Sequence, residues 1–134
     1  MRVQKIYQQI ANTRNDYQNK IISEIIKREP SFITIEDLNI CGMLKNRHLS
    51  KAIANQGFYQ FVSTLKYKCI LNGIELRQVD RFYPSSKICS DCGMIKQDLK
   101  LSDRVYICEC GNIIDRDLNA AVNLKNAKEY KVIA

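Results

Sequence analysis

The sequence has no apolar run that approaches the ~20 residues needed for a membrane-spanning helix. Its first residues, Met1 to Lys5, contain no apolar core of the kind that a signal peptide carries. It also has no internal repeat and no low-complexity tract. These absences argue against a membrane protein and a repeat architecture, and they predict an intracellular globular protein.

The chain has 134 residues, which is enough for one compact domain and not obviously enough for two. Hydrophobic residues make up 46% and charged residues 26%, the ordinary balance of a globular protein. The formal net charge is +7, with a pI near 9.2. A basic surplus of this size favours a polyanionic partner such as nucleic acid, although many small basic proteins bind nothing specific.

Two long segments have the spacing of helices. Residues 3–29 contain neither glycine nor proline, and their apolar residues recur at helical intervals. This helix is expected to end before Pro30, because the residue that precedes a proline avoids the helical region. Residues 50–71 return to helical spacing, and Asn72-Gly73 is a natural stop for that second helix.

The remaining segments complete an α/β order. Residues 32–36 predict a short buried strand, and residues 74–79 alternate as a second strand does. A module with two cysteine pairs follows at about residues 85–112, and residues 117–128 predict a closing helix. The apolar side of that helix is expected to carry Leu118, Ala121, Val122 and Leu124. The sheet of such a fold is small.

Four of the six cysteines form two close pairs separated by fifteen residues: Cys89 with Cys92, and Cys108 with Cys110. This spacing is close to that of a zinc ribbon, and four thiolates predict a structural ion because they close its coordination shell. Gly93 and Gly111 follow the pairs directly, where a positive φ lets amides point at the sulfurs. Disulfide pairing is the alternative, which an intracellular location disfavours. Cys69 is expected to be a small buried hydrophobe.

Two acidic residues lie at the ends of predicted elements, where their carboxylates could bind metal ions. Glu36 ends the first predicted strand, and Asp117 begins the closing helix. Carboxylates that converge at a sheet edge can hold two Mg²⁺ ions roughly 3.5–4 Å apart for phosphodiester hydrolysis. The residues alone leave other interpretations open, since Asp117 or Asp115 can cap the closing helix and Asp37 can form a turn.

With both acids and the cysteine pairs in view, the chain resembles the TnpB (OrfB) family of insertion-sequence proteins. These are RNA-guided, RuvC-like nucleases related to type V CRISPR effectors. The resemblance covers nearly the whole chain, with several motifs in the family's order. The matching stretches are Ile35-Glu36-Asp37-Leu38-Asn39, Gly42-Met43-Leu44-Lys45-Asn46, Val79-Asp80-Arg81-Phe82-Tyr83-Pro84-Ser85-Ser86-Lys87, and Asp115-Arg116-Asp117-Leu118-Asn119-Ala120-Ala121.

The resemblance implies a role for particular residues. Glu36 and Asp117 are similar to the second and third RuvC-type catalytic carboxylates, which bind magnesium. Asp115 matches a more variable part of the pattern. Cys89, Cys92, Cys108 and Cys110 are similar to the family's zinc ligands. The resemblance also places Arg104 at the scissile strand. If the chain binds nucleic acid, phosphate contacts are expected from the basic residues Lys45, Arg47, Arg81, Lys87 and Arg104.

One residue that the family requires has no counterpart. The first catalytic aspartate of the family lies on a strand upstream of the long helix, whereas this sequence starts at that helix and Asp16 falls inside the helical pattern. The family's N-terminal nucleic-acid-binding region also has no counterpart. The chain is therefore expected to be the C-terminal portion of a TnpB-like protein that does not cleave DNA efficiently by itself.

The expected organisation is a partial RNase H-like (RuvC-like) domain with an inserted zinc ribbon: residues 1–84 and 113–134 belong to the domain, and residues 85–112 form the ribbon. The expected cofactors are structural Zn²⁺ and, once the site is completed, catalytic Mg²⁺. DNA, a guide RNA and a separate N-terminal fragment are the expected partners, at a cytoplasmic, nucleoid-associated location. Two alternatives stay open: a non-catalytic nucleic-acid-binding module or complementing subunit, and a structural protein whose ribbon contacts other proteins.

Overall fold

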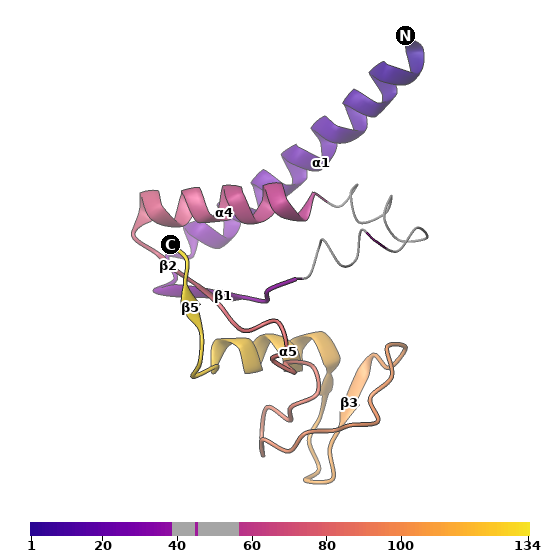
Figure 1. The fold of residues 1–134 in the computed structure, drawn as a ribbon, viewed down its shortest axis with the longest axis vertical. Helices are drawn as coiled ribbons and strands as arrows, with labels where there is room; N and C mark the ends of the chain where they lie inside the picture. Colours follow the sequence, from indigo (N-terminus) through magenta and orange to yellow (C-terminus); the bar gives the residue numbers. More distant parts are fainter. Residues whose placement is uncertain (39–44, 46–56) are drawn as a thin grey trace. The chain divides into compact units, whose positions relative to one another are not determined.

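The computed structural model describes residues 1–38, 45 and 57–134. They divide into two compact units, and most of their elements are labelled in Figure 1. The helical unit comprises Met1–Ile33, Leu38–Leu76 and Val132–Ala134, and the cysteine unit comprises Thr34–Asp37 and Arg77–Lys131. The predictions for Arg47 and for the first turns of the second helix, residues 50–56, lie outside the described residues.

The long N-terminal helix is confirmed as α1 (Arg2–Lys27). Its last turn closes with a hydrogen bond of 2.9 Å from the amide of Glu29 to the carbonyl of Ile26. Glu29 takes the left-handed conformation, with φ 49°, directly before Pro30, and the helix cannot continue past that pair. In the part of the chain that the structure describes, no helix has both the length and the apolar character required to cross a membrane.

The second helix, α4 (Phe58–Asn72), lies between two glycines in the left-handed conformation. Gly73, with φ 64°, confirms the predicted stop. Gly57, with φ 65°, precedes the helix, and a β-carbon at that position would lie 3.2 Å from the Arg14 side chain of α1. Both the backbone conformation and the close approach of α1 therefore favour glycine at position 57.

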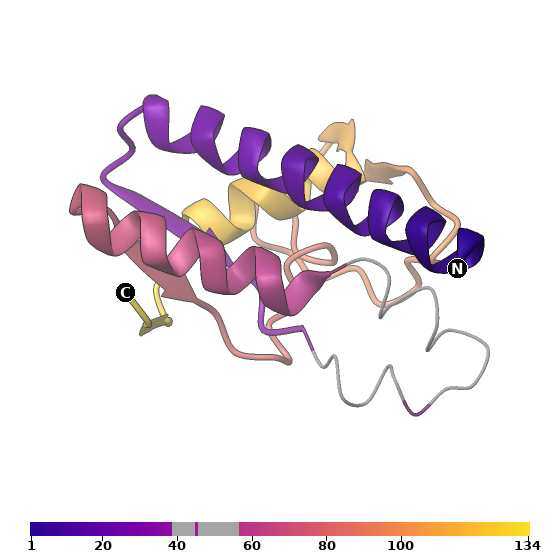
Figure 2. The ribbon, with the colours of Figure 1, turned by 90° about the horizontal axis from the view of Figure 1, so that it is seen from above.

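Helices α1 and α4 pack against each other in the helical unit, where Figure 2 shows them side by side. The residues that these helices bury are Ile22 of α1, and Leu65 and Cys69 of α4. Burial raises the pKa of the Cys69 thiol, because an uncharged thiol is favoured away from water. Cys69 is thus a small buried hydrophobe, as the sequence predicts.

Three short strands form a sheet in the order β1-β2-β5: β1 (Phe32–Ile35), β2 (Glu75–Gln78) and β5 (Lys131–Val132). Strands β1 and β2 confirm the two predicted strands. The expectation that β1 is buried was wrong: all four of its residues are half-buried, because so small a sheet covers little surface. Strand β5 was not predicted. Its segment joins the sheet through a hydrogen bond of 3.0 Å from the Leu76 amide to the Ala134 carbonyl.

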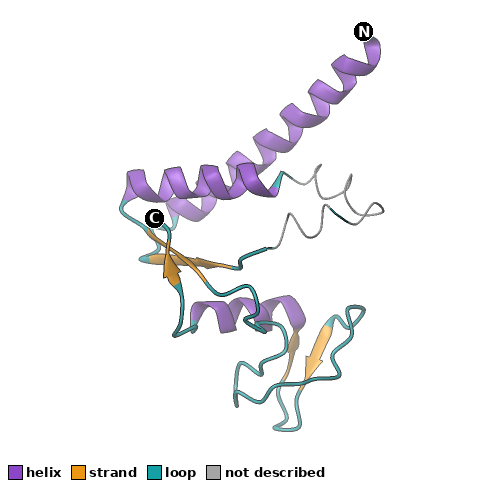
Figure 3. Ribbon diagram, in the orientation of Figure 1, coloured by secondary structure: helices purple, strands orange, loops and turns teal. Residues whose placement is uncertain are grey.

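The cysteine unit contains an antiparallel hairpin, β3 (Val105–Ile107) and β4 (Ile113–Asp115), seen among the orange strands of Figure 3. Alternate residues of a strand face opposite sides, so Tyr106 points inward and is 0% exposed while its neighbours on β3 are about half exposed. Tyr106 is the largest fully buried side chain of the described residues. Its hydroxyl donates a hydrogen bond of 2.9 Å to the Lys87 carbonyl.

The closing helix is α5 (Arg116–Lys125), which follows β4 directly and confirms the helix expected over residues 117–128. The prediction of its apolar side was wrong for Leu118 and Ala121, which are exposed, whereas Val122 and Leu124 are half-buried. Leu118 is 55% exposed, whereas Asn119 and Asn123 are 0% and 6% exposed. The two amides are buried because each finds backbone hydrogen-bond partners, and a buried polar group with partners avoids the cost of lost hydration.

Candidate metal centre and neighbouring acids

The two cysteine pairs meet in space. One sulfur from each of Cys89, Cys92, Cys108 and Cys110 lies within 4.8 Å of the other three. The Sγ atoms of Cys89 and Cys110 are 3.7 Å apart, and those of Cys92 and Cys108 are 3.6 Å apart. A disulfide bond is about 2.05 Å long, so these cysteines are free, and the disulfide alternative is excluded for them. Four sulfurs in this arrangement can hold one metal ion.

Each pair sits on a tight turn closed by its own backbone. In the first turn, the Gly93 amide bonds the Cys89 carbonyl at 2.9 Å, and in the second the Gly111 amide bonds the Cys108 carbonyl at 3.0 Å. Gly93 has φ 79° and Gly111 has φ 96°, which confirms the predicted left-handed glycines. A side chain at these positions would strain the turns that present the sulfurs.

The surroundings of the sulfurs separate their pKa values. Burial pushes the pKa of the Cys89 thiol upward, but the Cys92 amide, the Asn112 side chain and other donors outweigh burial and lower the pKa to about 6. The Cys110 pKa is lowered by the Asn112 amide, yet the neighbouring sulfurs and burial raise it to about 12. The Cys89 thiol therefore loses its proton readily, whereas the Cys110 thiol keeps its proton in hydrogen bonds with the neighbouring sulfurs. A cation among the four sulfurs favours their thiolate forms.

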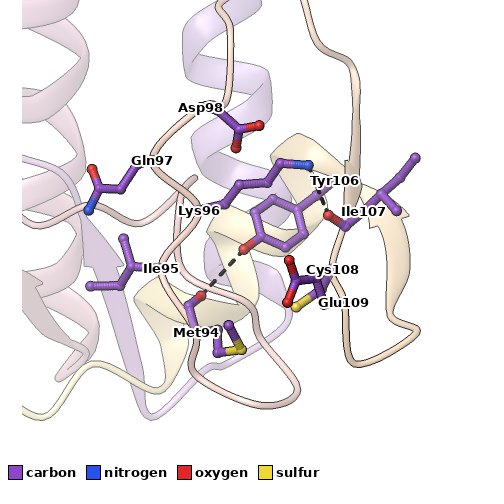
Figure 4. Close-up of a pocket in the computed structure, with 9 residues that line it drawn as sticks. All are labelled: Met94, Ile95, Lys96, Gln97, Asp98, Tyr106, Ile107, Cys108 and Glu109. Carbon is purple, nitrogen blue, oxygen red and sulfur yellow. Dashed lines mark hydrogen bonds between the residues drawn. The ribbon is translucent and has the colours of Figure 1, made fainter.

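A hollow of about 250 Å³ lies beside the cysteines, between residues 94–98 and residues 106–109 (Figure 4). The Tyr106 ring lies against it, and the Tyr106 hydroxyl approaches the Met94 carbonyl at 3.4 Å. Lys96 donates from Nζ to the Ile107 carbonyl at 3.1 Å. Neither predicted carboxylate lines this hollow, so the acids belong to a different part of the cysteine unit.

The first predicted acid, Glu36, directly follows β1 and is exposed. The hydroxyl of Ser85, which is 3% exposed, donates a hydrogen bond to Oε1 of Glu36. The neighbouring Asp37 forms an ion pair with Arg81 at 3.7 Å, so these two charges are already matched. Glu36 is consequently an oriented carboxylate at the surface of the cysteine unit.

The second predicted acid, Asp117, lies in the first turn of α5 and is exposed. The cap of α5 is Asp115, whose Oδ1 accepts hydrogen bonds of 3.0 Å from the amides of Asp117 and Leu118. Of the two acids that could cap this helix, Asp115 does so through one carboxylate oxygen. The Asp117 side chain does not cap the helix and is exposed.

Arg116, between these two acids, holds the turn before β3. Its Nη1 donates to the carbonyls of Lys100 at 3.3 Å, Leu101 at 3.0 Å and Asp103 at 3.3 Å. Its amide bonds the Arg104 carbonyl at 2.9 Å. Three consecutive residues thus cap a helix, support a loop and present an exposed carboxylate.

The predicted nucleic-acid contacts occupy varied positions. Lys45 and Arg104 are exposed, Lys87 is half-buried, and Arg81 is paired with Asp37. The register of the hairpin places Arg104 opposite Arg116. Arg116 is the residue directly before Asp117. The assignment of these residues to nucleic acid stays a prediction.

Reasoning from the sequence missed four residues that hold this unit together: Ser85, Tyr106, Asn119 and Asn123. The two asparagines are four residues apart and therefore share one face of α5. That spacing was the available signal, but polar helix residues more often face water.

Comparison with known proteins identifies the family. Residues 58–124, half of the chain, match the model described as "Cas12f1-like, TNB domain". The chain is 38% identical over 123 residues to a candidate RNA-guided DNA endonuclease of Streptomyces pristinaespiralis, covering 92% of this chain and 30% of that protein. It is 33% identical over 129 residues to TnpB-like protein L79 of Acanthamoeba polyphaga mimivirus, covering 91% of this chain and 24% of that protein. The chain belongs to the Cas12f1-like family, and its similarity to TnpB-like proteins confirms the resemblance inferred from its motifs.

The fold has a solved counterpart. Cas12f1, in a cryo-EM complex with guide RNA and target DNA, aligns with a TM-score of 0.67 and 23% identity over 95% of this chain and 36% of that chain. This likeness confirms an α/β fold shared with that protein. The chain spans about a third or less of the relatives it matches.

Proposed function

We propose that this chain is part of an RNA-guided DNA endonuclease and supplies two of the three carboxylates of a RuvC-like nuclease site, Glu36 and Asp117. The observation that carries the proposal is that the two aspartates at the start of α5 have different environments. Asp115 accepts the capping hydrogen bonds, and Asp117 is exposed beside it. An acid that is neither a cap nor buried is available as a metal ligand. The proposed reaction, cleavage of DNA, is taken from the name of a similar protein, an RNA-guided DNA endonuclease.

The proposed architecture is a partial RNase H-like domain with a zinc ribbon inserted at residues 85–112, between flanking portions 1–84 and 113–134. Four sulfurs within 4.8 Å of one another suit Zn²⁺, which favours tetrahedral thiolate ligation. Mg²⁺ prefers oxygen ligands, so Glu36 and Asp117 would hold it rather than the cysteines. When bound, Mg²⁺ would activate water and stabilise the leaving oxygen of a phosphodiester.

The proposed partners are DNA and a guide RNA. The net charge of +7 supports a polyanionic partner, and the solved relative is a complex with guide RNA and target DNA. Exposed Lys45 and Arg104 are proposed to contact phosphates; the Arg104 carbonyl accepts from the amide of Arg116, the residue before Asp117. Arg81 and Lys87 are proposed as additional contacts.

We expect binding to single-stranded DNA to weaken steeply with salt, because phosphate contacts release counterions. Replacing Arg104 with alanine should reduce the slope of log K against log [KCl] by about 1. Fluorescence anisotropy of a labelled oligonucleotide measures this slope. The matched control is Lys20→Ala, an exposed cation whose amine lies 2.7 Å from Asp16. Binding that does not depend on salt, or that Lys20→Ala weakens as much, contradicts the assignment.

We expect the 134 residues alone not to cleave DNA with Mg²⁺. Within the described residues, the one cluster of three or more metal-ligating side chains is the four cysteines, so no third carboxylate joins Glu36 and Asp117. A metal site without one ligand loses its geometry. Gel electrophoresis of labelled single-stranded DNA tests this, with Glu24→Gln, an exposed acid on α1, as the control. Turnover that Glu36→Gln abolishes and Glu24→Gln preserves would overturn the prediction.

The second candidate is a nucleic-acid-binding module without catalysis. It is favoured because, among the residues that the structure describes, no third carboxylate joins Glu36 and Asp117. The two candidates differ once a protein segment carrying the missing aspartate is added. Cleavage that appears only with that segment and requires Asp117 supports the endonuclease. Unchanged binding without cleavage supports the binding module.

A further inference from the structure

One short stretch of backbone connects the cysteines to both acids. We define the junction segment as residues 85–90, which lead into the first cysteine turn and include Cys89. Ser85 is 3% exposed and Cys89 is 1% exposed, and the other four residues of the segment are half-buried. At its middle, the Lys87 carbonyl accepts the Tyr106 hydroxyl at 2.9 Å. The segment is therefore anchored in the cysteine unit by its two buried residues and by this hydrogen bond.

Two asparagines on α5 hold the junction segment from the side of the helix. Asn119 accepts from the Ser90 amide at 3.0 Å and donates to the Ile88 carbonyl at 2.7 Å. Asn123 donates to the carbonyls of Ser85 and Ile88, each at 2.7 Å. A primary amide both donates and accepts, which an apolar residue of the same size cannot do. These bonds fasten α5 to the backbone that carries Cys89.

Ser85 continues the same network to the first acid. Its hydroxyl donates to Oε1 of Glu36, while its carbonyl accepts from Asn123. A donor on one carboxylate oxygen orients the group and leaves the lone pairs of the other oxygen for a metal ion. Glu36 is thus connected through Ser85 to the helix that carries the second acid.

Asp117 depends on the network through its helix. It lies two residues before Asn119 in the first turn of α5. A helix moves as a rigid element, so hydrogen bonds that place Asn119 also place the start of the helix. Displacement of the junction segment would therefore shift Asp117 and release Glu36 together.

We propose that Ser85, Asn119 and Asn123 are positioning residues that couple metal binding at the four cysteines to the geometry of Glu36 and Asp117. An ion held by the four thiolates fixes Cys89 and so the junction segment, and the hydrogen bonds carry that order to both acids. The role of the acids as Mg²⁺ ligands rests on the proposed function, whereas the coupling rests on the hydrogen bonds alone. Coupling of this kind is reciprocal, so an ion at the acids also tightens binding at the thiols.

The first test is hydrogen exchange of the full chain with Zn²⁺ bound and after chelation. In the wild type, chelation should speed exchange of the α5 amides by about 10-fold or more, because the helix loses its support. In Asn119→Ala, these amides should exchange fast in both states, while Co²⁺ substituted for Zn²⁺ keeps its tetrahedral thiolate spectrum. A purely structural role would disturb that spectrum as well. Lys125→Ala, an exposed change on the same helix, should retain the metal dependence of the wild type.

A second variant keeps the test decisive if Asn119→Ala does not fold. Asn123→Ala removes the hydrogen bonds to the Ser85 and Ile88 carbonyls and leaves those of Asn119 in place. It should weaken the dependence of α5 exchange on metal. Exchange of α5 that is the same with and without Zn²⁺ in the wild type would overturn the coupling.

The second test separates the coupling from the proposed function. Binding of Mn²⁺, as a spectroscopic substitute for Mg²⁺, is measured by electron paramagnetic resonance in the zinc-loaded chain. Ser85→Ala should weaken Mn²⁺ binding by about 10-fold, as is usual for loss of a group that orients a ligand, and Ser86→Ala should not. Equal effects of the two changes would overturn the role of Ser85. If the wild type binds no Mn²⁺ but α5 exchange still depends on Zn²⁺, the coupling stands and the proposed function fails.

Discussion

Replacing Cys89 with serine is expected to unfold the four-cysteine module while the helical unit keeps its helices. A structural Zn²⁺ site contributes on the order of 10–16 kcal/mol of apparent binding free energy, most of which folds the surrounding chain. The substitution removes the thiolate of Cys89, which is the buried ligand, 1% exposed, and the ligand that belongs to the junction segment. The hydrophobic core of the module is too small to compensate for the lost metal-binding energy; its largest buried side chain is Tyr106.

Hydrogen-exchange mass spectrometry and metal analysis measure this result. Amides of β3 and β4 should lose protection in Cys89→Ser, and those of α1 and α4 should keep it. Cys69→Ser is the matched control, because Cys69 is 0% exposed in the helical unit and has no role in the cluster. It should destabilise α4 and retain the metal. A Cys89→Ser protein that keeps one metal ion and full protection of β3 contradicts a structural site.

Replacing Tyr106 with alanine is expected to destabilise the metal-loaded module by about 3–5 kcal/mol, the usual cost of deleting a buried aromatic side chain. Tyr106 is 0% exposed, and its hydroxyl bonds the Lys87 carbonyl, which also accepts from the Lys96 amide at 2.9 Å. The substitution therefore leaves a cavity and removes one of the two hydrogen bonds to that carbonyl. Tyr106→Phe removes the hydroxyl alone and should cost about 1 kcal/mol. The difference between the two variants separates the packing of the ring from its hydrogen bond.

The opening free energy of the β3 amides, obtained from hydrogen exchange with Zn²⁺ present, measures both effects. Tyr59→Ala is the control, since Tyr59 is 80% exposed on α4 and surface changes usually stay within about 0.5 kcal/mol. If Tyr106→Ala alters the opening free energy no more than Tyr59→Ala does, the ring does not support the module.

Local pattern was enough to predict the elements with strong repetition. α1 has no glycine or proline in its interior, and α4 ends where Asn72 meets Gly73, so both follow from backbone preferences alone. The cysteine turns were predictable for the same reason, because the spacing of the pairs and the glycines after them are local features. Strand β5 was missed because two residues have no period to detect.

The buried side of α5 shows where hydropathy is insufficient. Leu118 is exposed and Asn119 is buried, the reverse of their ordinary preference. The preference reverses because Asn119 bonds the Ser90 amide and the Ile88 carbonyl of the junction segment, which lies about thirty residues earlier in the chain. Partners so far apart in sequence leave no local trace.

The spacing of the cysteines, the ends of the long helices and the order of the motifs are properties of neighbouring residues, and from them the α/β class, the four-thiol site and the family were inferred. The choice of Asp115 over Asp117 as the cap depends on which carboxylate reaches the first amides of α5. The connection of Glu36 to that helix through Ser85 and Asn123 depends on contacts across more than thirty residues. Such roles are decided by the folded chain, because a hydrogen bond depends on distance in space, and only folding brings these groups within its reach.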